Sequence, residues 1–113
     1  MVNQGYAAYK TASIDTADQS KLILMTYDAA IKNCKLALDI FDDPHKLEAR
    51  VKFLYKVQDA ITELMSALNL DTGDIAKNLY SLYDYMLRSV IDGAIRNKKD
   101  KIIEIQKYLE DLR

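Results

Sequence analysis

The sequence contains few residues that make turns. Its 113 residues include only three glycines and one proline. β-Sandwiches and barrels connect many short strands through turns that are rich in these residues, so the composition argues against an all-β fold. Half of the residues are hydrophobic and 29% are charged, which is typical of a folded chain with a packed core. The length allows one domain, built from a few long elements.

Residues that carry catalysis or bind metals are equally scarce. Cys34 is the only cysteine, so it cannot form an internal disulfide, and this suits a reducing compartment. His45 is the only histidine, and no obvious partner would orient it as a general base. The sequence has neither a Cys/His cluster with zinc spacing nor a glycine-rich phosphate loop. We therefore expect no enzyme activity, no catalytic residue, no metal site and no cofactor.

An excess of one charge and long apolar runs are also lacking. The chain has 16 basic and 17 acidic residues, a formal net charge of −1 that does not attract phosphate backbones, so nucleic acid is not an expected partner. No apolar run approaches the roughly 20 residues that span a membrane. The N-terminus lacks the basic and then apolar pattern of a secretory signal. We expect a cytoplasmic protein without a membrane span.

The hydrophobic periodicity predicts four helices, at about residues 17–41, 44–68, 75–96 and 100–112. In each of them apolar residues recur at steps of three and four, the spacing that places them in one stripe along the helix. The stripes of the first three helices, which we expect to form the core, consist of Leu24, Tyr27, Ile31, Cys34, Leu38 and Phe41; of Leu47, Val51, Leu54, Ile61, Met65 and Leu68; and of Ile75, Leu79, Leu82, Met86 and Val90.

Local signals mark the ends of these helices. Thr16 and Gln19 fit a capping box, in which each side chain accepts a hydrogen bond from a free backbone N–H group. Asp43 is a suitable N-cap and Pro44 a suitable first helical residue. Asn97 tolerates the left-handed conformation that often follows the last turn of a helix.

The loops between the four predicted helices are short, which favours antiparallel neighbours. We therefore predict an all-α fold, an antiparallel four-helix bundle formed by residues 16–113. Residues 1–15 carry no helical period and are expected to form a flexible N-terminal arm. Its two aromatic residues, Tyr6 and Tyr9, are candidates for covering an apolar groove of the bundle.

Two of the helices have more apolar surface than one core requires. The helix at 17–41 carries a second stripe, formed by Leu22, Met25, Ala29, Leu36 and Ile40. The apolar arc of the helix at 75–96 covers about half of its circumference, against roughly 100° for an ordinary surface helix. The arm covers such faces, or they bind a partner. The candidate partner-binding residues are Leu22, Met25, Ile40, Tyr80, Tyr83, Leu87 and Ile91.

Several segments resemble one family. The run Leu-Tyr-Asp-Tyr-Met at residues 82–86 is similar to the core motif of the flagellar secretion chaperones of the FliS type, and residues 94–97 follow it at that family's distance. Residues 6–9 resemble the family's aromatic arm. Residues 22–29 resemble the opening motif of its first helix, with Ala29 in place of the usual glycine.

The resemblance implies a function. Chaperones of this type bind the disordered C-terminal segment of flagellin in the cytoplasm, prevent its premature polymerisation and help to deliver it to the flagellar type III export apparatus. It also implies that Tyr6 and Tyr9 contact a component of the export gate. Weak self-association is expected when the client is absent. An alternative, from the residues alone, is a small homo-oligomeric structural or adaptor protein that uses the same apolar faces.

Overall fold

The structure, a computed structural model, describes residues 16–113. The predicted arm at 1–15, with Tyr6 and Tyr9, lies outside the described residues. Over residues 16–113 the chain forms four α-helices and no strand, which confirms the predicted all-α fold. The helices are α2 (Thr16–Asp39), α3 (Leu47–Ser66), α4 (Asp74–Ile95) and α5 (Lys99–Leu112), and short 3₁₀ turns lie at Pro44–Lys46 and Leu70–Thr72.

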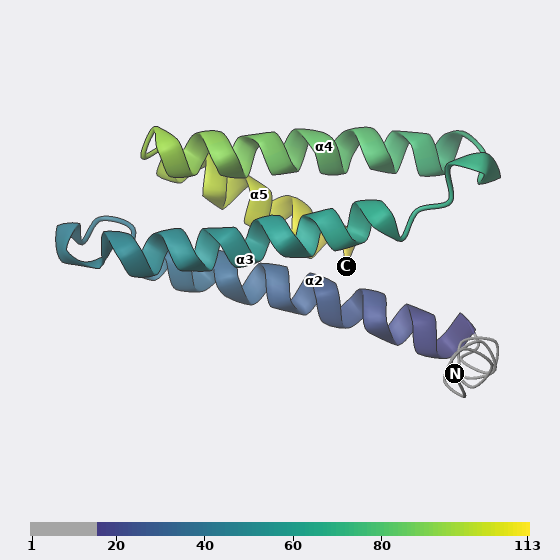
Figure 1. Cartoon of the computed structure of the whole chain (residues 1–113), viewed down its shortest axis with the longest axis horizontal. Coiled ribbons are helices and arrows are strands. Elements are labelled where there is room, and N and C mark those ends of the chain that lie inside the picture. Colours follow the sequence, from purple (N-terminus) through teal and green to yellow (C-terminus); the bar gives the residue numbers. More distant parts are fainter. Residues whose placement is uncertain (1–15) are drawn as a thin grey trace, which may run out of the picture.

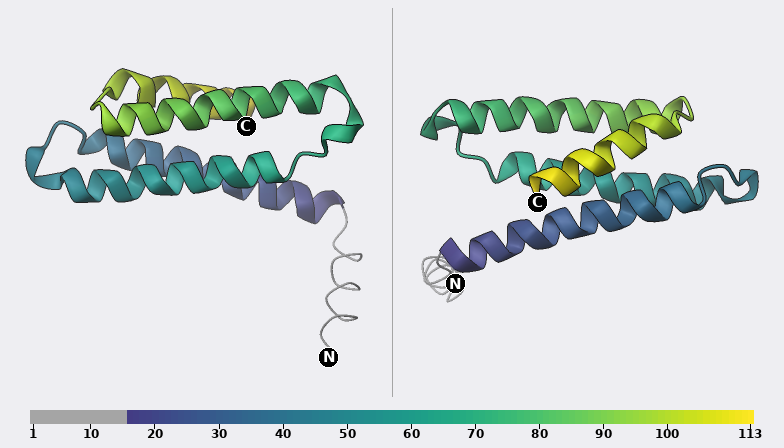
Figure 2. Two further views of the ribbon diagram at one scale, coloured as in Figure 1. Left: turned by 45° about the horizontal axis from the view of Figure 1, so that its top comes forward. Right: turned by 180° about the vertical axis from the view of Figure 1, so that it is seen from behind.

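The helices form an antiparallel bundle in which each packs against the next along the chain and α5 returns to α2 (Figures 1 and 2). Among the described residues, the backbones of α2 and α4 make no close approach to each other, and neither do those of α3 and α5. These two pairs therefore occupy opposite corners of the bundle. As a result, α3 lies between α2 and α4 on one side of the molecule (Figure 1).

The helix ends follow the local signals, with small differences in position. The Asp43 carboxylate accepts a hydrogen bond from the His45 N–H at 2.9 Å, and Pro44 opens the 3₁₀ turn that leads into α3. Asn97 has a positive φ of 56°, as expected for the residue that ends α4. The first helix ends at Asp39, two residues before the predicted end, because the chain already turns there toward the Asp43 cap.

One apolar stripe from each helix fills the core. α5 contributes Ile102, Ile105 and Leu109, which are fully buried. The other fully buried large side chains of residues 18–113 are Cys34, Leu54, Val57, Ile61, Met86 and Val90. Periodicity alone therefore identifies most of the core, since these positions recur at helical spacing.

The bundle is complete at one end only. α5 has 14 residues, whereas α2 has 24 and α4 has 22. It ends where Arg113 pairs with Asp28 on α2. Figure 2 shows α5 stopping about midway along α2. Leu24 and Ile75, predicted as core residues, lie beyond this point and are exposed, because no fourth helix covers them.

Leu47 also differs from the prediction: it opens α3 and its side chain is 53% exposed. The closed end of the bundle is held instead by the buried Arg50. Its guanidinium donates one hydrogen bond to the Phe41 carbonyl at 2.9 Å and another to the Asn97 side chain, and it stacks on the Phe41 ring at 4.4 Å. Arg50 therefore joins the loop after α2, the start of α3 and the turn before α5.

Replacement of Ile61 by Ala should lower the free energy of unfolding by about 2–5 kcal/mol, because it empties a fully buried core position. The measurement is urea unfolding followed by far-UV circular dichroism. Lys52→Ala on the exposed face of α3 is the matched control and should change stability by less than about 0.5 kcal/mol. Equal, small effects of both substitutions would contradict the assigned core.

Candidate protein-binding surface

Most of the apolar residues predicted to bind a partner do reach the surface. The side chains of Leu22 and Met25 on α2 are each 55% exposed. On α4, Tyr80 and Ile91 are exposed. The remaining residues of the predicted set that keep part of their surface open are Ile40 and Leu87, which are both half-buried.

Tyr83 differs from the rest of the predicted set, because it is a core residue. Only 4% of its surface is exposed, and its hydroxyl lies 2.5 Å from the hydroxyl of Tyr27 on α2. Tyr83 lies about 60° around the helix from Tyr80, on the side of the core, and its length lets it cross the bundle. Burial, together with the bond to Tyr83, raises the pKa of Tyr27 above its ordinary value. Tyr83 is therefore not part of the exposed surface.

Two residues of the second stripe of α2, Met25 and Ala29, line a groove between α2 and α3. The groove has a volume of about 350 Å³. Its lining residues are Met25, Thr26, Ala29 and Asn33 from α2, and Lys56, Asp59, Ala60 and Glu63 from α3. Farther along the same pair of helices, Ile40 lines a separate hollow with Phe53. We call the first of these the α2–α3 groove.

The exposed face of α4 borders a different groove, on the other side of α3. This α3–α4 groove has a volume of about 290 Å³. It is lined by Val51, Leu54, Tyr55, Gln58, Ile91, Ala94 and Ile95. Ile95 is 76% exposed and Tyr55 is 59% exposed, so much apolar surface stays open here.

The sequence reasoning missed the part that α3 plays in both grooves. It assigned surplus apolar surface only to the helices at 17–41 and 75–96. The spacing of Val51, Tyr55 and Gln58 by four and three residues was the available signal, since it places them on one edge of the helix. Periodicity did not reveal that α4 borders this edge, because it describes each helix separately.

The two grooves are not continuous with each other. They lie on opposite edges of α3, which Figure 1 shows between α2 and α4. The outer face of α3 carries charged residues such as Glu48 and Lys52. A single partner chain that contacts both α2 and α4 must therefore pass over α3 or around an end of the molecule. The surface predicted as one area shared by two helices consists of two areas in the structure.

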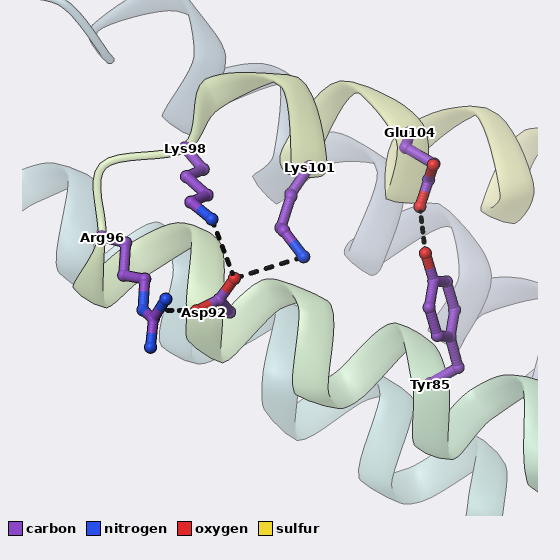
Figure 3. A network of polar contacts seen from close by, with 6 residues as sticks. All are labelled: Tyr85, Asp92, Arg96, Lys98, Lys101 and Glu104. Atoms are coloured by element: carbon purple, nitrogen blue, oxygen red, sulfur yellow. Dashed lines mark hydrogen bonds and ion pairs between the residues drawn. The ribbon is translucent and has the colours of Figure 1, made fainter.

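Polar contacts fix α5 on α4, as Figure 3 shows. Asp92 pairs with Lys101 at 3.2 Å and with Arg96 at 3.0 Å, and the Tyr85 hydroxyl donates to Glu104 at 2.7 Å. The Lys101 ammonium holds the pKa of Asp92 below its ordinary value. These groups are paired with one another, and their arrangement is that of a structural brace between two helices.

Neither Cys34 nor His45, the two side chains that could be chemically reactive, lies in surroundings that activate it. Cys34 is fully buried, and burial raises the pKa of its thiol to about 12, which disfavours the reactive thiolate. His45 lies exposed in the turn before α3. Within residues 16–113, no group of three or more His, Cys, Asp or Glu residues is placed to hold a metal ion. In the same part of the chain, none of the helices has the length and apolar character needed to cross a membrane.

Tyr83→Phe should destabilise the protein by about 1–3 kcal/mol, because it leaves the buried Tyr27 hydroxyl without its partner. The double variant Tyr27→Phe/Tyr83→Phe removes both hydroxyls and should be less destabilised than Tyr83→Phe alone. Urea unfolding of the two single variants and the double variant gives the coupling energy. Simple addition of the two single effects would show that the hydroxyls do not interact.

Comparisons with known proteins agree with the resemblance found in the sequence. The model of the family described as "Flagellar protein FliS" matches residues 2–113. The Flagellar secretion chaperone FliS of Bacillus subtilis (strain 168) is 30% identical over 112 residues, which are 99% of this chain and 83% of that protein. The protein of the same name from Salmonella typhimurium is 31% identical over 116 residues (96% of this chain, 84% of the relative).

A third relative, the Flagellar secretion chaperone FliS of Vibrio cholerae, is 36% identical in an alignment of 109 residues that covers 87% of this chain and 77% of that protein. The names of these relatives describe chaperones, and this points to a protein that is not an enzyme. The match to the family model extends over nearly the whole chain, from the segment before α2 to the end of α5. The chain therefore belongs to the FliS family of flagellar proteins.

Proposed function

We propose that this chain is a cytoplasmic export chaperone that binds the disordered C-terminal segment of flagellin. It prevents premature polymerisation of flagellin and helps to deliver it to the flagellar type III export apparatus. Family membership supports the chaperone role. The structural observation that carries the proposal is the pair of grooves beside α3, where apolar side chains such as Met25, Ile91 and Ile95 stay open.

The chemistry of these grooves suits a segment that folds as it binds. A disordered chain can place an apolar stripe into a groove between two helices while it becomes helical itself. Binding of this kind buries apolar surface and orders a flexible chain. It therefore has a negative heat-capacity change and an opposing ordering entropy.

The two grooves also define how the client is held. We propose that the client contacts α2 through Leu22, Met25 and Ile40, and α4 through Tyr80, Leu87 and Ile91. Because α3 lies between these sets, the client binds as two segments joined by a crossing stretch. Two linked weak contacts hold a chain far more tightly than either contact alone.

Met25→Glu and Ile91→Glu should each weaken binding of a flagellin C-terminal peptide by about tenfold or more, because each places a charge in an apolar contact. The measurement is isothermal titration calorimetry with the full chain. Both side chains are exposed, so the variants should keep the fold.

Ile103→Glu is the matched control, because Ile103 is an equally exposed apolar residue on α5, away from both grooves. Circular dichroism first verifies that each variant melts like the parent chain. If both groove variants bind as tightly as the control, the site assignment is wrong. If the parent chain does not bind the peptide, the proposed function itself is wrong. A mass that rises with concentration, without any peptide binding, would favour the homo-oligomeric alternative.

We also propose that residues 1–15, through Tyr6 and Tyr9, cover an apolar groove until the client displaces them, and that the same two tyrosines contact the export gate. Deletion of residues 1–15 should then raise peptide affinity or self-association, because the groove is freed. Calorimetry and sedimentation of the truncated chain are the measurements. Unchanged affinity together with unchanged mass would count against the covering role.

A further inference from the structure

The two grooves beside α3 differ in the chemistry of their walls. Gln58 is the one polar residue among those that line the α3–α4 groove. The α2–α3 groove, in contrast, has an apolar rim on α2, at Met25 and Ala29, and a charged wall on α3. The charged side chains of that wall are one cation, Lys56, and two anions, Asp59 and Glu63. The two grooves therefore suit different segments.

The acidic residues of the α2–α3 groove are not paired with Lys56, the cation on the same wall. Asp59 and Glu63 are four residues apart, so they lie one above the other on the same edge of α3. Neither forms an ion pair with any residue from 16 to 113, whereas Glu48 on the same helix meets Lys52. Glu63 accepts a hydrogen bond from Thr26 at 3.4 Å. This hydrogen bond is long, so the Glu63 carboxylate can still accept others.

The opposite wall contributes a further free acceptor. Asn33 is 91% buried and lines the same groove. Its side-chain nitrogen donates to the Ala29 carbonyl at 2.8 Å, which fixes the orientation of the amide. The amide oxygen accepts no hydrogen bond from the described residues and is accessible to solvent. It can therefore accept a hydrogen bond from a partner that enters the groove.

Two of the residues that line the groove have small side chains, Ala29 on α2 and Ala60 on α3. Small side chains let a third helix approach closely. Met25 on the rim is flexible and adapts to apolar side chains of different shape. The apolar rim and the acceptors of the walls together match a helix with an apolar face and donors beside it.

We infer that the α2–α3 groove takes an amphipathic helical segment of the client whose edge carries Lys or Arg side chains at a spacing of four residues. The apolar residues of that segment lie on Met25 and Ala29, and its cations meet Asp59 and Glu63. A donor of the same edge reaches the Asn33 amide. The inference rests on the proposed function and adds the chemical character of one of the two bound segments.

The test is calorimetry of the full chain with the C-terminal segment of its cognate flagellin, at about 0.05 M and 0.5 M salt. Glu63→Lys should weaken binding by about fivefold or more at low salt, since it replaces attraction by repulsion. The loss should shrink at high salt, where exposed charges are screened within roughly 4 Å. Asp111→Lys, an equal charge change on the exposed face of α5, is the matched control and should have little effect.

A charge swap makes the test specific. In a set of peptides that each have one Lys or Arg changed to Glu, one peptide should recover affinity for Glu63→Lys while losing affinity for the parent chain. If Glu63→Lys and Asp111→Lys act alike at both salt concentrations, or if no peptide recovers affinity, the inference is wrong. Failure of the parent chain to bind any peptide would instead overturn the proposed function.

Two other occupants of the groove have distinct signatures. If the Glu63→Lys effect disappears when residues 1–15 are deleted, the groove belongs to that segment, and the inference is overturned. If Glu63→Lys abolishes self-association of the parent chain and leaves peptide binding intact, the groove belongs to a second copy, and the inference is overturned as well.

Discussion

The arrangement of this molecule depends on the contacts that α3 and α5 each make with both α2 and α4, whose backbones do not approach each other closely. α2 and α4 are parallel and lie at opposite corners, and they are held there by α3 on one side and by the apolar stripe of α5 on the other. Ile102, Ile105 and Leu109 fill the space between them at the closed end. The buried side chains of α2 and α4 point into the core. Exposed apolar residues of both helices therefore lie along their borders with α3. The grooves are therefore a direct result of how the core is filled.

The position of α3 also limits the size of each open apolar area. The exposed apolar residues of α2 and α4 lie on opposite sides of it, and charged residues such as Lys52 and Lys56 lie between them. Large continuous apolar patches promote association with the wrong partners. Because the open apolar surface is divided between two grooves, it does not form one large continuous patch.

Sequence periodicity was sufficient for the fold class, the four helices and most core residues, because an amphipathic stripe and its end signals are local properties. It was insufficient where a neighbour decides the outcome. Leu24 and Ile75 follow the core spacing, yet they are exposed because α5 stops short of them. Tyr83 follows the spacing of the outer face, yet it crosses the core to Tyr27. Likewise, the edge of α3 that carries Tyr55 borders a groove only because α4 lies beside it.

The buried Arg50 makes the two ends of the bundle unequal in their freedom to open. At its end, one guanidinium joins the chain after α2, the first turns of α3 and the turn before α5, and separation of any of these would break hydrogen bonds made by a buried charge. α5 stops short of the first turns of α2 and α4 and does not cover them. Local unfolding costs least where buried contacts are fewest. Amide hydrogens should therefore exchange fastest in those first turns. The end of the bundle that α5 leaves uncovered unfolds locally at a lower free-energy cost than the end that Arg50 holds.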